Sequence, residues 1–249
     1  SSLTMKIDNK KEIYSFDVEV NQPVEKEGED KAEKISYRIF IAKPTRRQTE
    51  EAELEYSIEI SNCLKKGVLT KAMLLKKYDE LTGGDQHRLK RDLKYLNEIS
   101  TDYGIKFQKL QEMKRGKSTK QLEKNKEFQK DTEELIELRK EIVRVETEYS
   151  SLFDFTADNK ASNRQILWYL SNLTYFSKDG EEEWHPLVPG DSWEKQRDYL
   201  YDEEEEPKDK VLEAAFPKAL TFVSLWYHSI APTTEDFEEL NEEIDSGKI

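Results

Sequence analysis

Residues 89–110, LKRDLKYLNEISTDYGIKFQKL, carry the first of two apolar ladders that determine how this chain folds. The second ladder lies in residues 135–152, LIELRKEIVRVETEYSSL. In both, apolar side chains recur at alternating steps of four and three, with one rung of the first ladder missing at Ser100. This spacing places them on one narrow face of an α-helix. The first ladder consists of Leu89, Leu93, Leu96, Tyr103, Phe107 and Leu110, and the second of Leu135, Leu138, Ile142, Val145, Tyr149 and Leu152.

A polar segment separates the two ladders at residues 113–119, MKRGKST. Two amphipathic helices joined by a short polar turn pack as an antiparallel hairpin along their apolar faces. We therefore predict two long helical arms, at residues 86–114 and 119–153. At ~1.5 Å of rise per residue, each arm would be about 40 Å long. Such a hairpin serves as a spacer or a docking element.

Two stretches near the N-terminus alternate apolar and polar residues with a period of two, which is typical of half-buried β-strands. They lie at residues 13–20 and 35–41 and predict a β-hairpin. A third strand at residues 3–8 is an open alternative. Because two strands alone are marginally stable, this hairpin is expected to pack on helices or on another chain.

A helix is predicted to follow the β-hairpin. Thr45 suits its N-cap, and Gln48 stands three residues later, as in a capping box. Gly67 is expected to end this helix, and Thr70 to cap the next one.

The composition becomes aromatic and apolar after Asp154, which predicts a second, compact helical lobe. Its expected elements are a buried helix at 163–176, an acidic break at 203–207, a second apolar helix at 212–230, with Pro217 as its bend or late start, and a terminal helix capped by Thr233 or Thr234.

The predicted fold class is therefore mainly α, with an N-terminal β-hairpin, a long antiparallel helical hairpin resembling a coiled coil, and a C-terminal helical lobe. The predicted segments are 1–44 for the β-hairpin, 45–85 for two short helices, 86–153 for the helical hairpin and 154–249 for the acidic C-terminal lobe.

The composition limits the classes of partner. Of the 249 residues 37% are charged, and the formal net charge is −13. Such a charge argues against general binding to nucleic acid or to an anionic membrane. We expect no transmembrane helix and no signal peptide, because no apolar run is long enough and no basic region precedes one. The lone Cys63 excludes an internal disulfide and fits a reducing compartment.

The charge is unevenly distributed along the chain. Residues 106–130 contain nine Lys or Arg against three Glu, whereas residues 181–249 contain twenty Asp or Glu against six Lys or Arg. The basic segment is either a solvated helix surface or a docking site for an acidic surface, including the acidic lobe of a neighbouring copy. Its candidate partner-binding residues are Lys106, Lys109, Lys114, Arg115, Lys117 and Lys120.

A set of aromatic residues in the C-terminal lobe also has two interpretations. Trp193 and Trp226, together with Trp168, Tyr169 and Tyr227, would either fill the core or form an anchor patch at an interface. We include Trp193 and Trp226 among the candidate partner-binding residues.

The sequence contains no recognisable catalytic motif. The three histidines are scattered, and the single cysteine cannot form a thiolate cluster. Residues 116–119, GKST, resemble the end of a phosphate-binding loop, but Gln111 replaces its first glycine and no strand precedes it. We therefore predict no catalytic residue, no cofactor and no metal. An enzyme whose site is built from scattered carboxylates would need a cleft that brings them together.

Five short segments carry a resemblance to a known class of proteins. They are KPTRRQ at 43–48, EEAEL at 50–54, KGVLTK at 66–71, SLWY at 224–227 and TEDFE at 234–238. These segments resemble structural and tail-assembly proteins of tailed bacteriophages, in particular the large contractile-tailed phages, in which a β-hairpin leads into a helix that begins with Pro-Thr. The long helical hairpin is not part of the resemblance.

The resemblance implies a virion component or assembly factor without enzymatic activity. Its expected place is the tail, baseplate or connector region of a virion that is assembled in the host cytoplasm. Its expected partners are other virion or assembly proteins, including copies of itself. The alternative is a tail-assembly chaperone or adaptor that binds a client and leaves before the particle matures.

Overall fold

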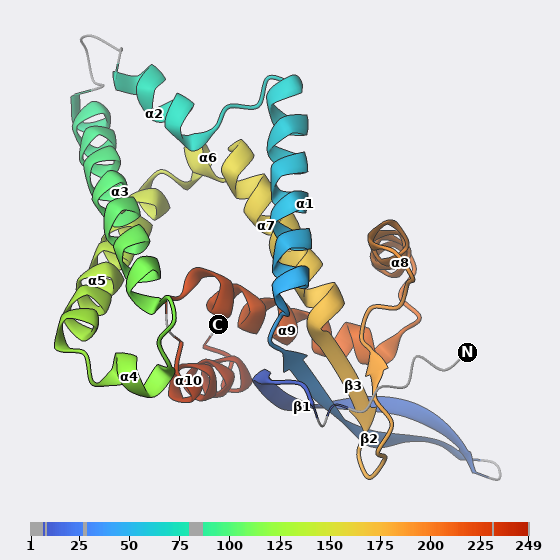
Figure 1. The fold of residues 1–249 in the computed structure, drawn as a ribbon. Helices are drawn as coiled ribbons and strands as arrows, with labels where there is room; N and C mark the ends of the chain where they lie inside the picture. The colour runs from blue at the N-terminus through green and yellow to red at the C-terminus, as the bar shows by residue number, and fades with distance from the viewer. Residues whose placement is uncertain (1–6, 8, 27–28, 80–86, 231, 249) are drawn as a thin grey trace. The chain divides into compact units, whose positions relative to one another are not determined.

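The computed structural model describes residues 7, 9–26, 29–79, 87–230 and 232–248 of the chain (Figure 1). The protein is 66% helical, and ten helices and one four-stranded sheet lie within the described residues. The predicted mainly α fold class is therefore confirmed. The strand considered at 3–8 lies almost entirely outside the described residues.

The chain forms two compact units. Residues 1–56 and 163–249 make the first, and residues 57–162 make the second. The first unit thus joins the two ends of the chain, and each unit is described separately below.

The first unit contains an antiparallel sheet whose strands follow the order β1-β2-β3-β4. The strands are β1 (Glu12–Lys26), β2 (Glu29–Ala42), β3 (Thr174–Lys178) and β4 (His185–Pro186). The long ribbon of β1 and β2 is the predicted hairpin, and β3 lies beside β2 (Figure 1). In its register Val18 pairs with Tyr37, and Phe16 with Ile39, so that these four buried side chains share one face.

Strand β3 corrects one sequence prediction. The helix expected at 163–176 is α7 (Ala157–Leu173), and Thr174 begins a strand that pairs with Tyr37–Ile41 of β2. Thr174 and Tyr175 are both buried although they point to opposite faces of the sheet. A short apolar run buried on both faces cannot be distinguished from the end of a buried helix by its periodicity. Its β-branched and aromatic residues favour the strand.

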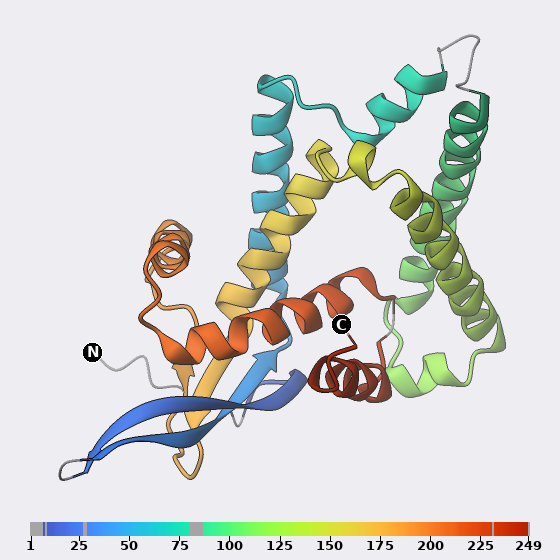
Figure 2. The ribbon, with the colours of Figure 1, turned by 180° about the vertical axis from the view of Figure 1, so that it is seen from behind.

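Helices α7, α9 (Lys210–His228) and α10 (Thr234–Asp245) supply the rest of the core of the first unit. Figure 2 shows α9 running across the sheet. Four aromatic rings join the sheet to the helices: the Phe222 ring lies 4.8 Å from that of Tyr14 and 5.0 Å from that of Phe16, and the Phe237 ring lies 5.2 Å from that of Tyr14. Such ring pairs contribute stabilisation beyond that from the apolar area they bury.

The break in the acidic run comes later than predicted. Helix α8 (Trp193–Glu205) continues through most of the run, so the break expected at 203–207 lies between Glu205 and Lys210 instead. The side chain of Glu203 accepts backbone hydrogen bonds from Lys208 (2.9 Å) and Asp209 (2.8 Å), and this contact fixes the turn into α9. Since α9 begins at Lys210, Pro217 lies inside it and does not mark a late start.

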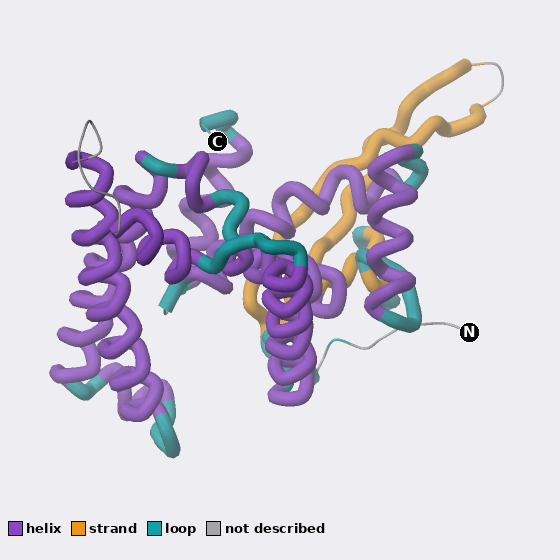
Figure 3. The backbone as a smooth tube through the Cα atoms, turned by 90° about the horizontal axis from the view of Figure 1, so that it is seen from above, coloured by secondary structure: helices purple, strands orange, loops and turns teal. Residues whose placement is uncertain are grey.

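The second unit is built on the predicted helical hairpin. Its helices are the C-terminal part of α1 (Arg46–Lys65), α2 (Lys71–Asp79), α3 (His87–Lys114), α4 (Thr119–Glu123), α5 (Lys126–Glu148), α6 (Ser150–Phe153) and the first turns of α7. Helices α3 and α5 lie side by side (Figure 3). The second arm, expected as one helix at 119–153, is divided into α4, α5 and α6. Asn125 interrupts it because its side chain accepts the Phe128 N–H and caps a new helix.

Several predicted caps are present. Thr45 and Gln48 exchange the two hydrogen bonds of a capping box, and the Thr70 hydroxyl accepts the Met73 N–H. Gly67 has a φ of 81°, as expected for a helix-ending glycine. At the last helix the cap is Thr233, which forms a capping box with Asp236.

The ends of the second unit meet around Lys71. The Leu69 carbonyl accepts the Ala157 N–H at 2.9 Å, and the Lys71 N–H donates to Asp158 Oδ2 at 2.6 Å. The Lys71 ammonium pairs with the Glu146 carboxylate. Burial lowers the pKa of the Lys71 ammonium to about 8.

Gly190→Ala is expected to destabilise the first unit by about 2–3 kcal/mol. The added Cβ would lie 2.8 Å from the backbone nitrogen of Gln196, and the φ of 145° is strained for any side chain. Gly180→Ala is the control: its φ is 83°, nothing lies within 4 Å of the added Cβ, and the expected cost is about 1 kcal/mol. Urea unfolding followed by tryptophan fluorescence reports on this unit, because all four tryptophans belong to it. Equal losses for the two variants would contradict the close contact.

Candidate interaction surfaces

The two apolar ladders form the contact surface between α3 and α5. Six rungs are nearly inaccessible to solvent: Leu93, Leu96, Leu110, Leu135, Ile142 and Val145. Phe107 is the exception among the predicted rungs, because 37% of it is exposed while its ring stacks on Tyr103 at 6.0 Å. The hairpin is thus held by buried apolar side chains from both arms.

Polar contacts flank this seam and show that the helices are antiparallel. They are Asp92 with Tyr149 (2.5 Å), Tyr95 with Glu141 (3.0 Å), Lys106 with Glu134 (3.7 Å) and Lys109 with Asp131 (3.0 Å). As the residue numbers rise along α3, those of the partners fall along α5. Hydrogen bonds to carboxylates raise the pKa of the Tyr149 hydroxyl and of the Lys109 ammonium.

Two candidate partner-binding residues therefore belong to the hairpin itself. Lys106 pairs with Asp102 and Glu134, and Lys109 pairs with Glu127 and Asp131. The sequence showed these lysines only as part of a basic segment, because their acidic partners lie eighteen or more residues away on the other arm or one turn away on the same helix.

The remaining candidates of the segment lie at the end of the hairpin. Lys114 is half-buried, and burial lowers the pKa of its ammonium. Arg115, Lys117, Lys120 and Lys124 are exposed, and none of the four forms an ion pair with another described residue. We call these four residues the basic turn.

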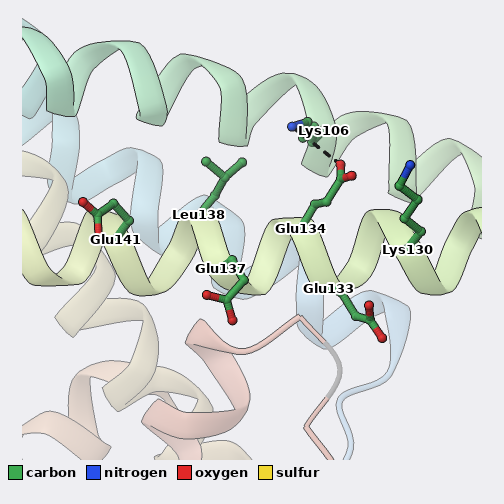
Figure 4. A pocket seen from close by; sticks show the side chains of 7 residues that line it. All are labelled: Lys106, Lys130, Glu133, Glu134, Glu137, Leu138 and Glu141. Atoms are coloured by element: carbon green, nitrogen blue, oxygen red, sulfur yellow. Dashed lines mark ion pairs between the residues drawn. The ribbon is translucent and has the colours of Figure 1, made fainter.

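A groove of about 580 Å³ runs along α5 (Figure 4). Its lining consists of Lys106, Lys130, Glu133, Glu134, Glu137, Leu138 and Glu141. The groove is open to solvent, and its carboxylates are spread along two sides of one helix: Glu134 points toward Lys106, whereas Glu133 and Glu137 point the other way (Figure 4). Within the described ranges, no cluster of three or more His, Cys, Asp or Glu is arranged to hold a metal ion.

The two tryptophan candidates pack against the core of the first unit. Trp226 is partly buried and meets Tyr169 edge to face at 5.0 Å. Trp193 is also partly buried, and the Arg197 guanidinium lies 5.5 Å from its ring. The buried Trp193 Nε1 has no hydrogen-bond partner among the residues described.

A second groove, of about 390 Å³, lies between α8 and α9 in the first unit. Leu200, Leu212 and Phe216, which are buried or partly buried, give it an apolar floor, and the exposed Pro207 and Pro217 complete its apolar lining. Glu203, Glu204 and Glu213 give it an acidic rim. Glu203 is engaged in the turn, while Glu204 and Glu213 are exposed and form no ion pair with other described residues. Sequence reasoning missed this α8–α9 groove because it placed a break where α8 continues.

Comparisons with protein-family models, with curated proteins and with solved structures found no match to this chain. Among the described helices, none is both long enough and apolar enough to cross a membrane.

Leu96→Ala is expected to cost about 3 kcal/mol of stability in the second unit, because Leu96 is fully buried in the seam. Ile105→Ala is the matched control on the same helix: Ile105 is 66% exposed, and its loss is expected to change stability by less than about 0.5 kcal/mol. Urea unfolding followed by far-ultraviolet circular dichroism measures both. Similar losses for the two variants would show that the seam does not hold the hairpin together.

Proposed function

We propose that this chain is a non-enzymatic structural or assembly protein that acts through protein–protein interfaces. The observation that carries the proposal is the hairpin of α3 and α5. Its arms hold each other through a buried seam, while its basic turn forms no ion pair with another described residue. A seam of that kind holds the charged groups of the turn in a preorganised position, which reduces the conformational entropy that the turn loses when a partner binds.

The biological setting of the proposal is the virion of a tailed phage, in the tail, baseplate or connector region. It rests on the sequence resemblance of the segments around residues 43–71 and 224–238. The partners would be other virion or assembly proteins, including further copies of the chain, brought together in the host cytoplasm. The strongly acidic composition would keep the free subunit soluble before assembly.

A tail-assembly chaperone or adaptor is the second candidate. The α8–α9 groove favours it, because an apolar floor open to solvent is a place where a client side chain would bind. Such a protein would act during assembly and would be absent from the finished particle.

Mass spectrometry of purified particles, combined with lysine crosslinking of native assemblies, tests the function. A structural subunit is expected at a fixed copy number, with crosslinks from Lys117 and Lys120 to neighbouring subunits. Lys76 and Lys94, which are exposed elsewhere in the second unit, serve as reference positions. Detection only in assembly intermediates would favour the chaperone, and absence from both would contradict both candidates.

A further inference from the structure

We propose that the α8–α9 groove of one copy binds the basic turn of a second copy. This inference rests on the proposed function and names one of its partners. The described structure supplies both surfaces on the same chain, each exposed and without an internal ion-pair partner.

The groove has the chemistry that receives a long basic side chain. Its floor is formed by Leu200, Leu212 and Phe216, with an acidic residue from each helix, Glu204 and Glu213, at the rim. A lysine or arginine can lay its methylene groups on an apolar floor while its charged end remains at the polar edge. A purely apolar side chain would make no charge interaction with the two carboxylates.

The basic turn offers several side chains of this kind on one short element. Lys120 and Lys124 stand four residues apart, at α4 and its C-cap, so they project from the same side of the helix. The Ser118–Gln121 capping box fixes the start of α4. Lys117 precedes this cap and lies in the turn itself. No large apolar residue between 111 and 130 is among the exposed ones, so the turn would bind through its lysines and arginine.

Charge complementarity identifies a second copy as the occupant. Residues 113–130 contain seven Lys or Arg against two Glu, whereas residues 194–213 contain nine Asp or Glu against four Lys or Arg. Two copies with a net charge of −13 repel each other over most of their surface. Approach is favourable where the basic turn of one meets an acidic surface of the other, and the groove combines that surface with a recess.

The contact would be heterologous, because the two surfaces it joins are different parts of the chain. Each bound copy would still have one free groove and one free turn. Further copies would therefore add head to tail, and the assembly would close into a ring or continue as an open series, depending on the rotation between neighbours.

Sedimentation velocity of the full chain over a concentration series tests the proposal. In about 50 mM salt, wild-type protein is expected to self-associate, and in about 500 mM salt the association is expected to weaken strongly because screening shortens the range of the charges. Charge reversal in the turn (Lys117→Glu with Lys120→Glu) or at the rim (Glu204→Lys with Glu213→Lys) is expected to weaken association by about tenfold or more. A wild-type chain that remains monomeric at every concentration in low salt overturns the proposal.

Two control pairs separate this contact from a general effect of charge. Lys76→Glu with Lys94→Glu makes the same change as the turn variant, and Glu182→Lys with Glu239→Lys makes the same change as the rim variant, all at exposed positions outside both surfaces. The control pairs are expected to retain wild-type association within about twofold to threefold, since distant surface changes contribute little. Association lost equally in the controls and in the test variants contradicts a specific contact.

Mixing the turn variant with the rim variant distinguishes binding between two copies from binding of the turn to the groove of the same chain. The turn variant keeps an intact groove and the rim variant keeps an intact turn, so an equal mixture is expected to form mixed assemblies more strongly than either variant associates alone. A variant that carries all four reversals is expected to self-associate again, because both charges have changed sign. A mixture that stays monomeric overturns the proposal. These measurements use the purified chain alone, so their failure is distinct from absence of the chain from particles.

Discussion

Burial of the apolar seam between α3 and α5 is the interaction on which the second unit depends. Each fully buried leucine contributes roughly 1.5–3 kcal/mol relative to an exposed one, whereas an exposed ion pair contributes about 0–1 kcal/mol. Leu96 and Leu135 are completely buried, but the side chain of Lys109, which forms two of the flanking ion pairs, is 53% exposed. The leucines therefore hold the arms together, and the flanking charges fix which residues lie opposite one another.

The periodic parts of the fold could be predicted from the sequence because a local pattern determines them. The ladders define one face of each helix, and the alternation around Phe16 and Ile39 defines one face of the ribbon. The caps at Thr45 and Thr233 follow from a side chain that accepts a backbone hydrogen bond three residues later. These signals need no knowledge of the rest of the chain.

The features that sequence reasoning missed depend on contacts between distant residues. Thr174 becomes part of a strand because β2, more than 130 residues earlier, provides its hydrogen-bonding partner. Lys106 and Lys109 turn toward carboxylates on the opposite arm. The α8–α9 groove exists because Glu203 accepts two backbone hydrogen bonds and so ties the end of one helix to the start of the next. Local periodicity contains no information about such pairings.

Some basic residues of the hairpin are paired beside the seam and others remain exposed at the basic turn, and this difference affects how the chain would bind a partner. The lysines nearest the carboxylates of α5 are neutralised inside the hairpin, so the basic character that remains for a partner is concentrated where α3 ends. A partner held mainly by a few exposed charges over a small apolar recess would bind in a salt-dependent and reversible way. Assembly of a particle from subunits benefits from such contacts, because a wrongly placed subunit can dissociate before the next one fixes it. In the assembly that we propose, the seam would give the turn a defined position, and the weak outer contact would let that position be sampled and corrected.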